Sequence, residues 1–180
     1  ANKVWNASRF IMMNMEGKDI VKPDEKDLEP VDMWILSKLN DTVKEVTANM
    51  EAFELGIAVS KIFDFIWEEF CDWYIEMVKP RLYNSDDVKS QNAALYTLRE
   101  VLIDALKLLH PYMPFITEEI FLTIQSEEES IMISSWPEYS EERAYTKEEK
   151  EAEITKEAVR GIRNLRTEMN VPHSRKALVY

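Results

Sequence analysis

The first predicted helix carries a polar face whose residue types suit a chemical role. Opposite its apolar side, five residues fall within about 120° of arc on a helical wheel: Lys3, Asn6, Arg9, Phe10 and Met13. Aromatic rings stack on splayed RNA bases, Asn and Arg hydrogen-bond base edges, and Lys neutralises phosphate. Two interpretations therefore stay open: an RNA-binding surface, or a surface on which Phe10 packs against another helix or domain.

The last predicted helix carries a stripe of basic residues opposite its apolar face. The stripe holds Lys156, Arg160, Arg163 and Arg166, with Arg175 and Lys176 following. Such a stripe can follow a phosphate backbone. Glutamates interleave with it, at 153, 157 and 168, and favour an ordinary solvated polar face. The amphipathic pattern predicts that the buried side holds Ile154, Ala158, Ile162, Leu165 and Met169.

Catalytic and metal-binding patterns are missing from the sequence. The two histidines, His110 and His173, have no Cys, His or carboxylate partner at metal-ligand spacing. No nucleophile motif occurs, and the three glycines form no phosphate-binding loop. We therefore expect no catalytic residue, no metal and no cofactor in this chain.

Composition indicates a helical protein with one substantial core. The chain has 180 residues, 46% of them hydrophobic, and its few glycines disfavour folds with many tight turns. Cys71 is the single cysteine, which suits a small buried hydrophobe in a reducing cytoplasm. No apolar run reaches the roughly 18 residues of a membrane span, so we expect a cytoplasmic protein without membrane contact. The net charge of −12 restricts any RNA contact to a local patch.

Apolar periodicity and prolines predict an all-α helical bundle. The expected helices run from about Lys3 to Met15, Met33 to Met50, Glu54 to Lys79 and Ala94 to Leu109, with Pro80 stopping the third. Pro114 opens a fifth helix whose buried face would be Phe115, Ile116, Ile120 and Ile124. Residues 125–145 should form an irregular segment strapped onto the bundle.

The C-terminal part is predicted to be a separate unit. Thr146 and Glu149 match a capping box that opens the last helix, and Pro172 closes it. Residues 177–180 begin to look like a truncated strand. We accordingly divide the chain into a bundle, 1–145, and a region, 146–180, that holds the last helix and the start of a C-terminal subdomain.

Several segments resemble the class I aminoacyl-tRNA synthetases. FIWEEFCDWYIEMVKPRLY (65–83) and LLHPYMPFITEEIF (108–121) resemble the helical domain that follows the catalytic core in the valine, isoleucine and leucine enzymes. NKVWNASRFIMMN (2–14), DMWILSKLN (32–40) and IRNLRTEMNVP (162–172) are similar to the valine enzymes in particular. The resemblance covers nearly the whole chain.

The resemblance implies a bundle that binds the anticodon stem-loop of valine tRNA. In the valine enzymes the positions of Asn6, Arg9 and Phe10 face the anticodon, and Lys3 lies one turn earlier. Asp72 and Trp73 would lie beneath the same loop, as secondary candidates. Further secondary tRNA candidates come from the basic stripe of the last helix: Arg160, Arg163 and Arg166.

The resemblance also implies a catalytic domain in the same polypeptide, and that domain would use ATP. Its two adenylate-binding signatures, a His-Ile-Gly-His-like turn and a Lys-Met-Ser-Lys-Ser-like loop, occur nowhere in this sequence. We therefore expect no aminoacylation by this chain. Two alternatives remain: the same domain from an isoleucine enzyme, and a helical protein-interaction module.

Overall fold

The structure is a computed structural model that describes residues 2–172 and 175–176. Within these residues it contains helices and no strand, so the predicted all-α class is confirmed. The α-helices are α1 (Asn2–Met15), α2 (Pro30–Glu51), α3 (Leu55–Asp64), α4 (Ile75–Leu82), α5 (Val88–Leu109), α6 (Pro114–Ile124) and α7 (Thr146–Glu168). A π-helical segment, η2 (Phe65–Tyr74), joins α3 to α4, and three short 3-10 turns are η1 (Glu25–Asp27), η3 (Ile131–Ile133) and η4 (Glu141–Arg143). The strand predicted at 177–180 lies outside the described residues.

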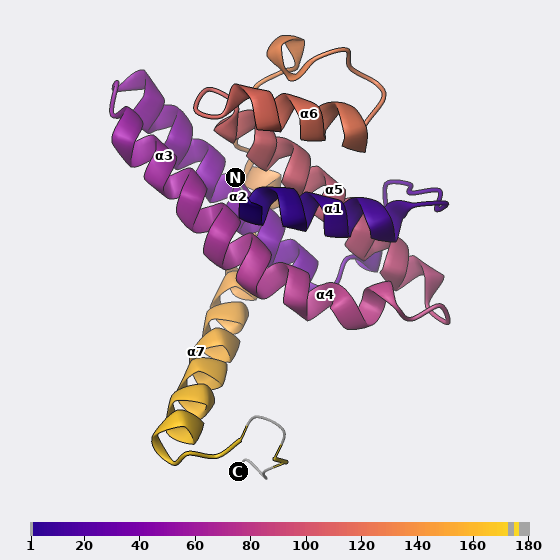
Figure 1. The fold of residues 1–180 in the computed structure, drawn as a ribbon, viewed down its shortest axis with the longest axis vertical. Coiled ribbons are helices and arrows are strands. Elements are labelled where there is room, and N and C mark those ends of the chain that lie inside the picture. The colour runs from indigo at the N-terminus through magenta and orange to yellow at the C-terminus, as the bar shows by residue number, and fades with distance from the viewer. Residues whose placement is uncertain (1, 173–174, 177–180) are drawn as a thin grey trace.

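The core lies among α2, α5 and the long α3–η2–α4 rod. Trp34, Phe70, Tyr74 and Leu98 are among its fully buried side chains. Helix α1 lies across the bundle, α6 packs on α5, and α7 projects from the bundle as an arm (Figure 1). The strap predicted for 125–145 is confirmed, since Ile131 is buried and the Trp136 indole donates to Thr47 Oγ1 over 2.9 Å.

The third predicted helix is one rod that contains a long π-helical stretch. A π-helix closes its turns with i→i+5 hydrogen bonds, and such segments are frequent at functional sites. The prediction that Pro80 stops this rod is wrong, because the helix continues to Leu82. A proline this close to the C-terminus removes little intrahelical bonding. Arg81, in the last turn, is instead held from outside the rod.

A buried carboxylate anchors that end of the rod. Asp32, fully buried, accepts two hydrogen bonds from Arg81 at 2.8 and 2.9 Å and one from the Tyr74 hydroxyl at 2.8 Å. It also accepts the Glu29 backbone N–H at 3.0 Å, which completes a capping box at the start of α2. Four donors satisfy both oxygens, so the charge is compensated. The network fixes the C-terminal end of η2 against α2.

Helix α7 packs with the opposite face from the one predicted. Its apolar residues are largely exposed: Ile154 by 67%, Leu165 by 56% and Met169 by 66%. The buried residue is Lys156, exposed by 1%. Its ammonium lies 2.7 Å from one carboxylate oxygen each of Glu69 and Glu153, so pairing compensates the burial of the charge.

Two smaller predictions are wrong, the second only in part, since the predicted buried face of α6 is confirmed at Ile120 and Ile124 but not at Phe115. Glu149 does not close a capping box with Thr146, because it accepts a hydrogen bond from Ser37 and pairs with Lys38 at 3.4 Å. Phe115 is 91% exposed. Helix α6 buries residues at i, i+3, i+4 and i+7 spacing, and these are Thr117, Ile120, Phe121 and Ile124. That register leaves Phe115 on the solvent side.

Candidate nucleic-acid interface

The polar face of α1 is held outward by the burial of the opposite face. Val4, Ser8 and Ile11 are buried, and the Ser8 hydroxyl donates to the Val4 carbonyl over 2.7 Å. Asn6 and Arg9 are exposed as a result. Their side chains carry the hydrogen-bonding groups that read base edges.

Phe10 lies at the border between this face and the core. Its ring is half-buried, and the Lys79 ammonium of α4 lies 5.6 Å from its centroid, within cation–π range. Lys79 also pairs with Glu76 at 2.5 Å. Part of the ring packs on the bundle, which the packing interpretation expected. The remaining exposed part, beside a lysine, is what the RNA interpretation requires.

Lys3 joins the start of α1 to η2. Its ammonium lies 2.6 Å from Asp72 Oδ1 and donates to the Trp67 carbonyl over 3.2 Å. It also lies 5.2 Å from the centroid of the Trp67 ring. The structure thus brings together Lys3 and Asp72, which are 69 positions apart in the sequence.

Trp73 lies beneath the basic side of α7. Its ring centroid is 5.9 Å from Lys156 Nζ, 5.5 Å from the Arg160 guanidinium and 5.7 Å from that of Arg163. Cations within about 6 Å of an indole centroid are attracted to the face of the ring, which favours these positions of both side chains. Both arginines are exposed, so they present positive charge to solvent.

The basic stripe of α7 therefore splits into three parts. Lys156 is buried, contrary to the prediction that it lies on a solvated face. Arg160 and Arg163 face solvent beside Trp73. Arg166 donates to the carbonyl of Pro172 over 2.9 Å and to that of Arg175, which places it in the C-terminal turn.

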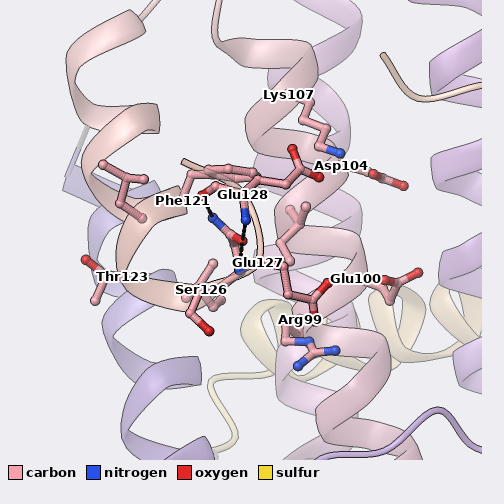
Figure 2. A pocket seen from close by; sticks show the side chains of 13 residues that line it. Arg99, Glu100, Asp104, Lys107, Phe121, Thr123, Ser126, Glu127 and Glu128 are labelled. Carbon is pink, nitrogen blue, oxygen red and sulfur yellow. Dashed lines mark hydrogen bonds between the residues drawn. The ribbon is translucent and has the colours of Figure 1, made fainter. Parts of the chain in front are cut away.

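A polar pocket of about 440 Å³ lies between α5 and the segment from Phe121 to Glu128 (Figure 2). Arg99, Glu100, Asp104 and Lys107 line its α5 side, and Glu127 and Glu128 come from the loop. Burial, aided by the nearby Glu100 charge, raises the pKa of Asp104 to about 6. The lining mixes both charges and contains no His or Cys. Across the described residues no group of three or more His, Cys, Asp or Glu could hold a metal ion.

Cys71 is a buried structural residue. It is 9% exposed, and desolvation raises the pKa of its thiol to about 11. A thiol that stays protonated at neutral pH is a poor nucleophile. The prediction of a small buried hydrophobe is confirmed.

Comparison with known proteins identifies the family. Residues 32–180 match the model of the anticodon-binding domain of tRNA ligase. The chain belongs to that anticodon-binding domain family. It is similar to the valine–tRNA ligases of Clostridium tetani (53% identity, 99% of this chain), Clostridium perfringens (54%, 99%) and Thermotoga maritima (45%, 100%). It spans only 20% of the length of each of these relatives.

A solved structure shares the fold of this anticodon-binding domain. The LeuRS of Agrobacterium radiobacter K84, in a ternary complex with tRNA and LeuAMS, superposes with a TM-score of 0.59 at 19% identity. The match covers 79% of this chain and 16% of that one. Helix α1 precedes the residues matched by the family model, yet the valine–tRNA ligases align with at least 99% of the chain. The helix with the polar face is therefore part of the similarity to those enzymes.

The sequence did not predict two contacts on this surface and one network in the core. Lys79 beside Phe10 and the Lys3–Asp72 pair depend on how α1 crosses the η2–α4 rod. The buried Asp32 network has no local sequence signal, because Glu29-x-x-Asp32 is not the Ser/Thr-x-x-Glu/Gln sequence pattern of a capping box. Within the described residues no helix is both long and apolar enough to cross a bilayer.

Proposed function

We propose that this domain binds the anticodon stem-loop of valine tRNA through the polar face of α1. The observation that carries the proposal is the exposure of Asn6 and Arg9 beside the half-exposed Phe10 ring. A stacking ring flanked by an amide and a guanidinium suits single-stranded loop bases. Valine is favoured over isoleucine by the identity of 45 to 54% with valine–tRNA ligases.

We assign a secondary role to the surface around Trp73. Arg160 and Arg163, within cation–π distance of its ring, would contact the phosphate backbone of the stem, where guanidinium groups form paired hydrogen bonds. Asp72 positions Lys3 beside the anticodon-binding face. Phosphate contact limited to a few arginines agrees with the net charge of −12, because an acidic protein can bind RNA only through a local patch.

We further propose that the domain works as part of a valine–tRNA ligase whose catalytic domain uses ATP. The support is the match to 20% of the length of enzymes of that name. The exposed apolar side of α7, with Ile154, Leu165 and Met169, adds to it. Exposed apolar side chains gathered on one face are typical of interaction surfaces.

The test is a titration of RNA stem-loops into the 180-residue chain at one fixed salt concentration. A loop with a valine anticodon should bind more tightly than the same loop with a changed middle base. Phe10→Ala should weaken binding by about 1 to 3 kcal/mol, the range for loss of one base stack. Phe115→Ala is the matched control, since this exposed phenylalanine of α6 lies outside the proposed surface.

The outcomes separate the candidate functions. Equal affinity for matched and changed loops would contradict anticodon recognition. Preference for an isoleucine anticodon would move the assignment to the isoleucine enzymes. Absence of RNA binding even at low salt would favour the alternative of a helical protein-interaction module.

A further inference from the structure

A second aromatic surface adjoins the face of α1. Phe63 and Trp67, one turn apart on the α3–η2 rod, stack with ring centroids 4.5 Å apart and planes inclined by 16°. Phe63 is 50% exposed, although it is a large apolar side chain. Trp67 is half-buried.

Lys3 connects this pair to the proposed anticodon-binding face. Its ammonium lies 5.2 Å from the Trp67 centroid while Asp72 holds it at 2.6 Å. The Trp67 ring therefore packs against both Phe63 and a fixed cation. The Phe63 ring is the outermost member of this group and remains open to solvent.

The spacing of Lys3 and Phe10 on α1 relates the pair to the proposed anticodon-binding face. Lys3 and Phe10 are seven residues apart on α1, which corresponds to about 10 Å along the helix axis. Both contact the same rod, Lys3 at Trp67 and Phe10 at Lys79. A single-stranded loop that places one base on Phe10 can therefore extend along the rod toward Trp67 and Phe63.

The charges around the Phe63–Trp67 pair determine whether a phosphate or a base of an RNA would bind there. The positive charge of Lys3 is paired with Asp72, whose side chain is 58% exposed. A compensated pair is a weak phosphate site, whereas an exposed ring in a rigid stack offers a flat surface to any base. The surface thus favours a nucleobase over a phosphate.

We propose that the Phe63–Trp67 pair is a second base-stacking platform, which takes an unpaired nucleobase of the RNA loop a few nucleotides away from the one bound at Phe10. This inference rests on the proposed function. Because every base has a π-face, stacking here contributes affinity that is nearly independent of base identity. Discrimination between anticodons stays with Asn6 and Arg9.

The test compares Phe63→Leu and Phe63→Tyr in the same stem-loop titration. Leucine keeps an apolar side chain against Trp67 and removes the ring. Phe63→Leu should weaken binding of matched and changed loops by the same factor, about 5- to 100-fold. Phe63→Tyr should bind as the unchanged chain does, and Phe115→Ala should have no effect. Urea unfolding of each variant separates a loss of RNA affinity from a loss of fold.

A stem-loop with one abasic nucleotide in its loop gives a second readout. Moving the abasic site along the loop should identify one position at which Phe63→Leu no longer weakens binding, because the stacked base is already missing. Unchanged affinity of Phe63→Leu, with Phe10→Ala still impaired, would overturn the platform and leave the proposed function intact. A change in the ratio between matched and changed loops would also overturn it. Equal binding of both loops by the unchanged chain would refute the proposed function instead.

Discussion

Replacing Lys156 by methionine tests how α7 is attached to the bundle. The lysine is 1% exposed, and its ammonium makes three hydrogen bonds: 3.0 and 2.7 Å to the two oxygens of Glu69, and 2.7 Å to Glu153. These contacts use all three ammonium hydrogens. Methionine keeps an apolar stem near the Trp34 ring and removes only the charge and the donors.

The expected loss of unfolding free energy depends on how far the carboxylates of Glu69 and Glu153 are exposed to water. At an effective dielectric constant of about 20, each 2.7 Å pair attracts by about 6 kcal/mol, and desolvation of the ions offsets most of this. Truncating one partner of a fully buried pair costs about 3 to 5 kcal/mol. Here the side chains of Glu69 and Glu153 are 21% and 41% exposed, so water replaces part of the lost bonding. We therefore expect a lower figure, about 2 to 3 kcal/mol.

The assay is urea unfolding followed by tryptophan fluorescence. Lys156→Met should lower the free energy of unfolding by about 2 to 3 kcal/mol. Lys150→Met is the matched control on the exposed side of α7, and it should change stability by less than about 0.5 kcal/mol. Adding Glu69→Gln to Lys156→Met should cost less than the sum of the single changes. Stability of Lys156→Met equal to that of the control would refute the reasoning that this ion pair fastens α7.

Two further predictions concern strained or desolvated positions. Because the pKa of Asp104 is raised from 3.8 to about 6, the folded state binds a proton more tightly than the unfolded state, and stability falls as pH rises through that window. Asp104→Asn should therefore be more stable than the unchanged chain by up to about 3 kcal/mol in urea unfolding at pH 7.5 and show little gain near pH 4. A gain independent of pH would contradict this. Phe53 is 88% exposed with φ 58°, in the left-handed region, so Phe53→Gly should raise the unfolding free energy by up to about 1 kcal/mol. Phe53→Ala, which keeps the Cβ atom, should show no such gain in the same urea unfolding measurement.

The comparison of α1 with α7 shows where sequence periodicity suffices. In α1 the apolar residues Val4 and Ile11 are buried and Asn6 and Arg9 are exposed, as the wheel predicts. Burial of an apolar stripe is the strongest available stabilisation for that helix, and nothing competes with it. In α7 the burial of Lys156 competes with burial of the apolar stripe, because carboxylates from two helices compensate the charge of the lysine.

The residues of the candidate site also divide into those that the sequence predicts and those that only tertiary packing brings there. A polar face on one helix depends only on local spacing, so the sequence predicts that Lys3, Asn6, Arg9 and Phe10 share it. The residues that surround this face depend on how α1 crosses the rod. Lys79 and Trp67 reach it from positions at least 64 residues away, and no local pattern encodes that proximity.

By itself, the sequence determined the helical class, the start of α6 at Pro114, and the polar face of α1, because these follow from backbone geometry and the spacing of apolar side chains. Tertiary structure decided which charges are buried. Asp32 and Lys156 lie inside because partners distant in sequence supply the hydrogen bonds that compensate their desolvation. The same packing stacks Phe63 on Trp67 beside Lys3, and so determines which aromatic rings remain available for RNA.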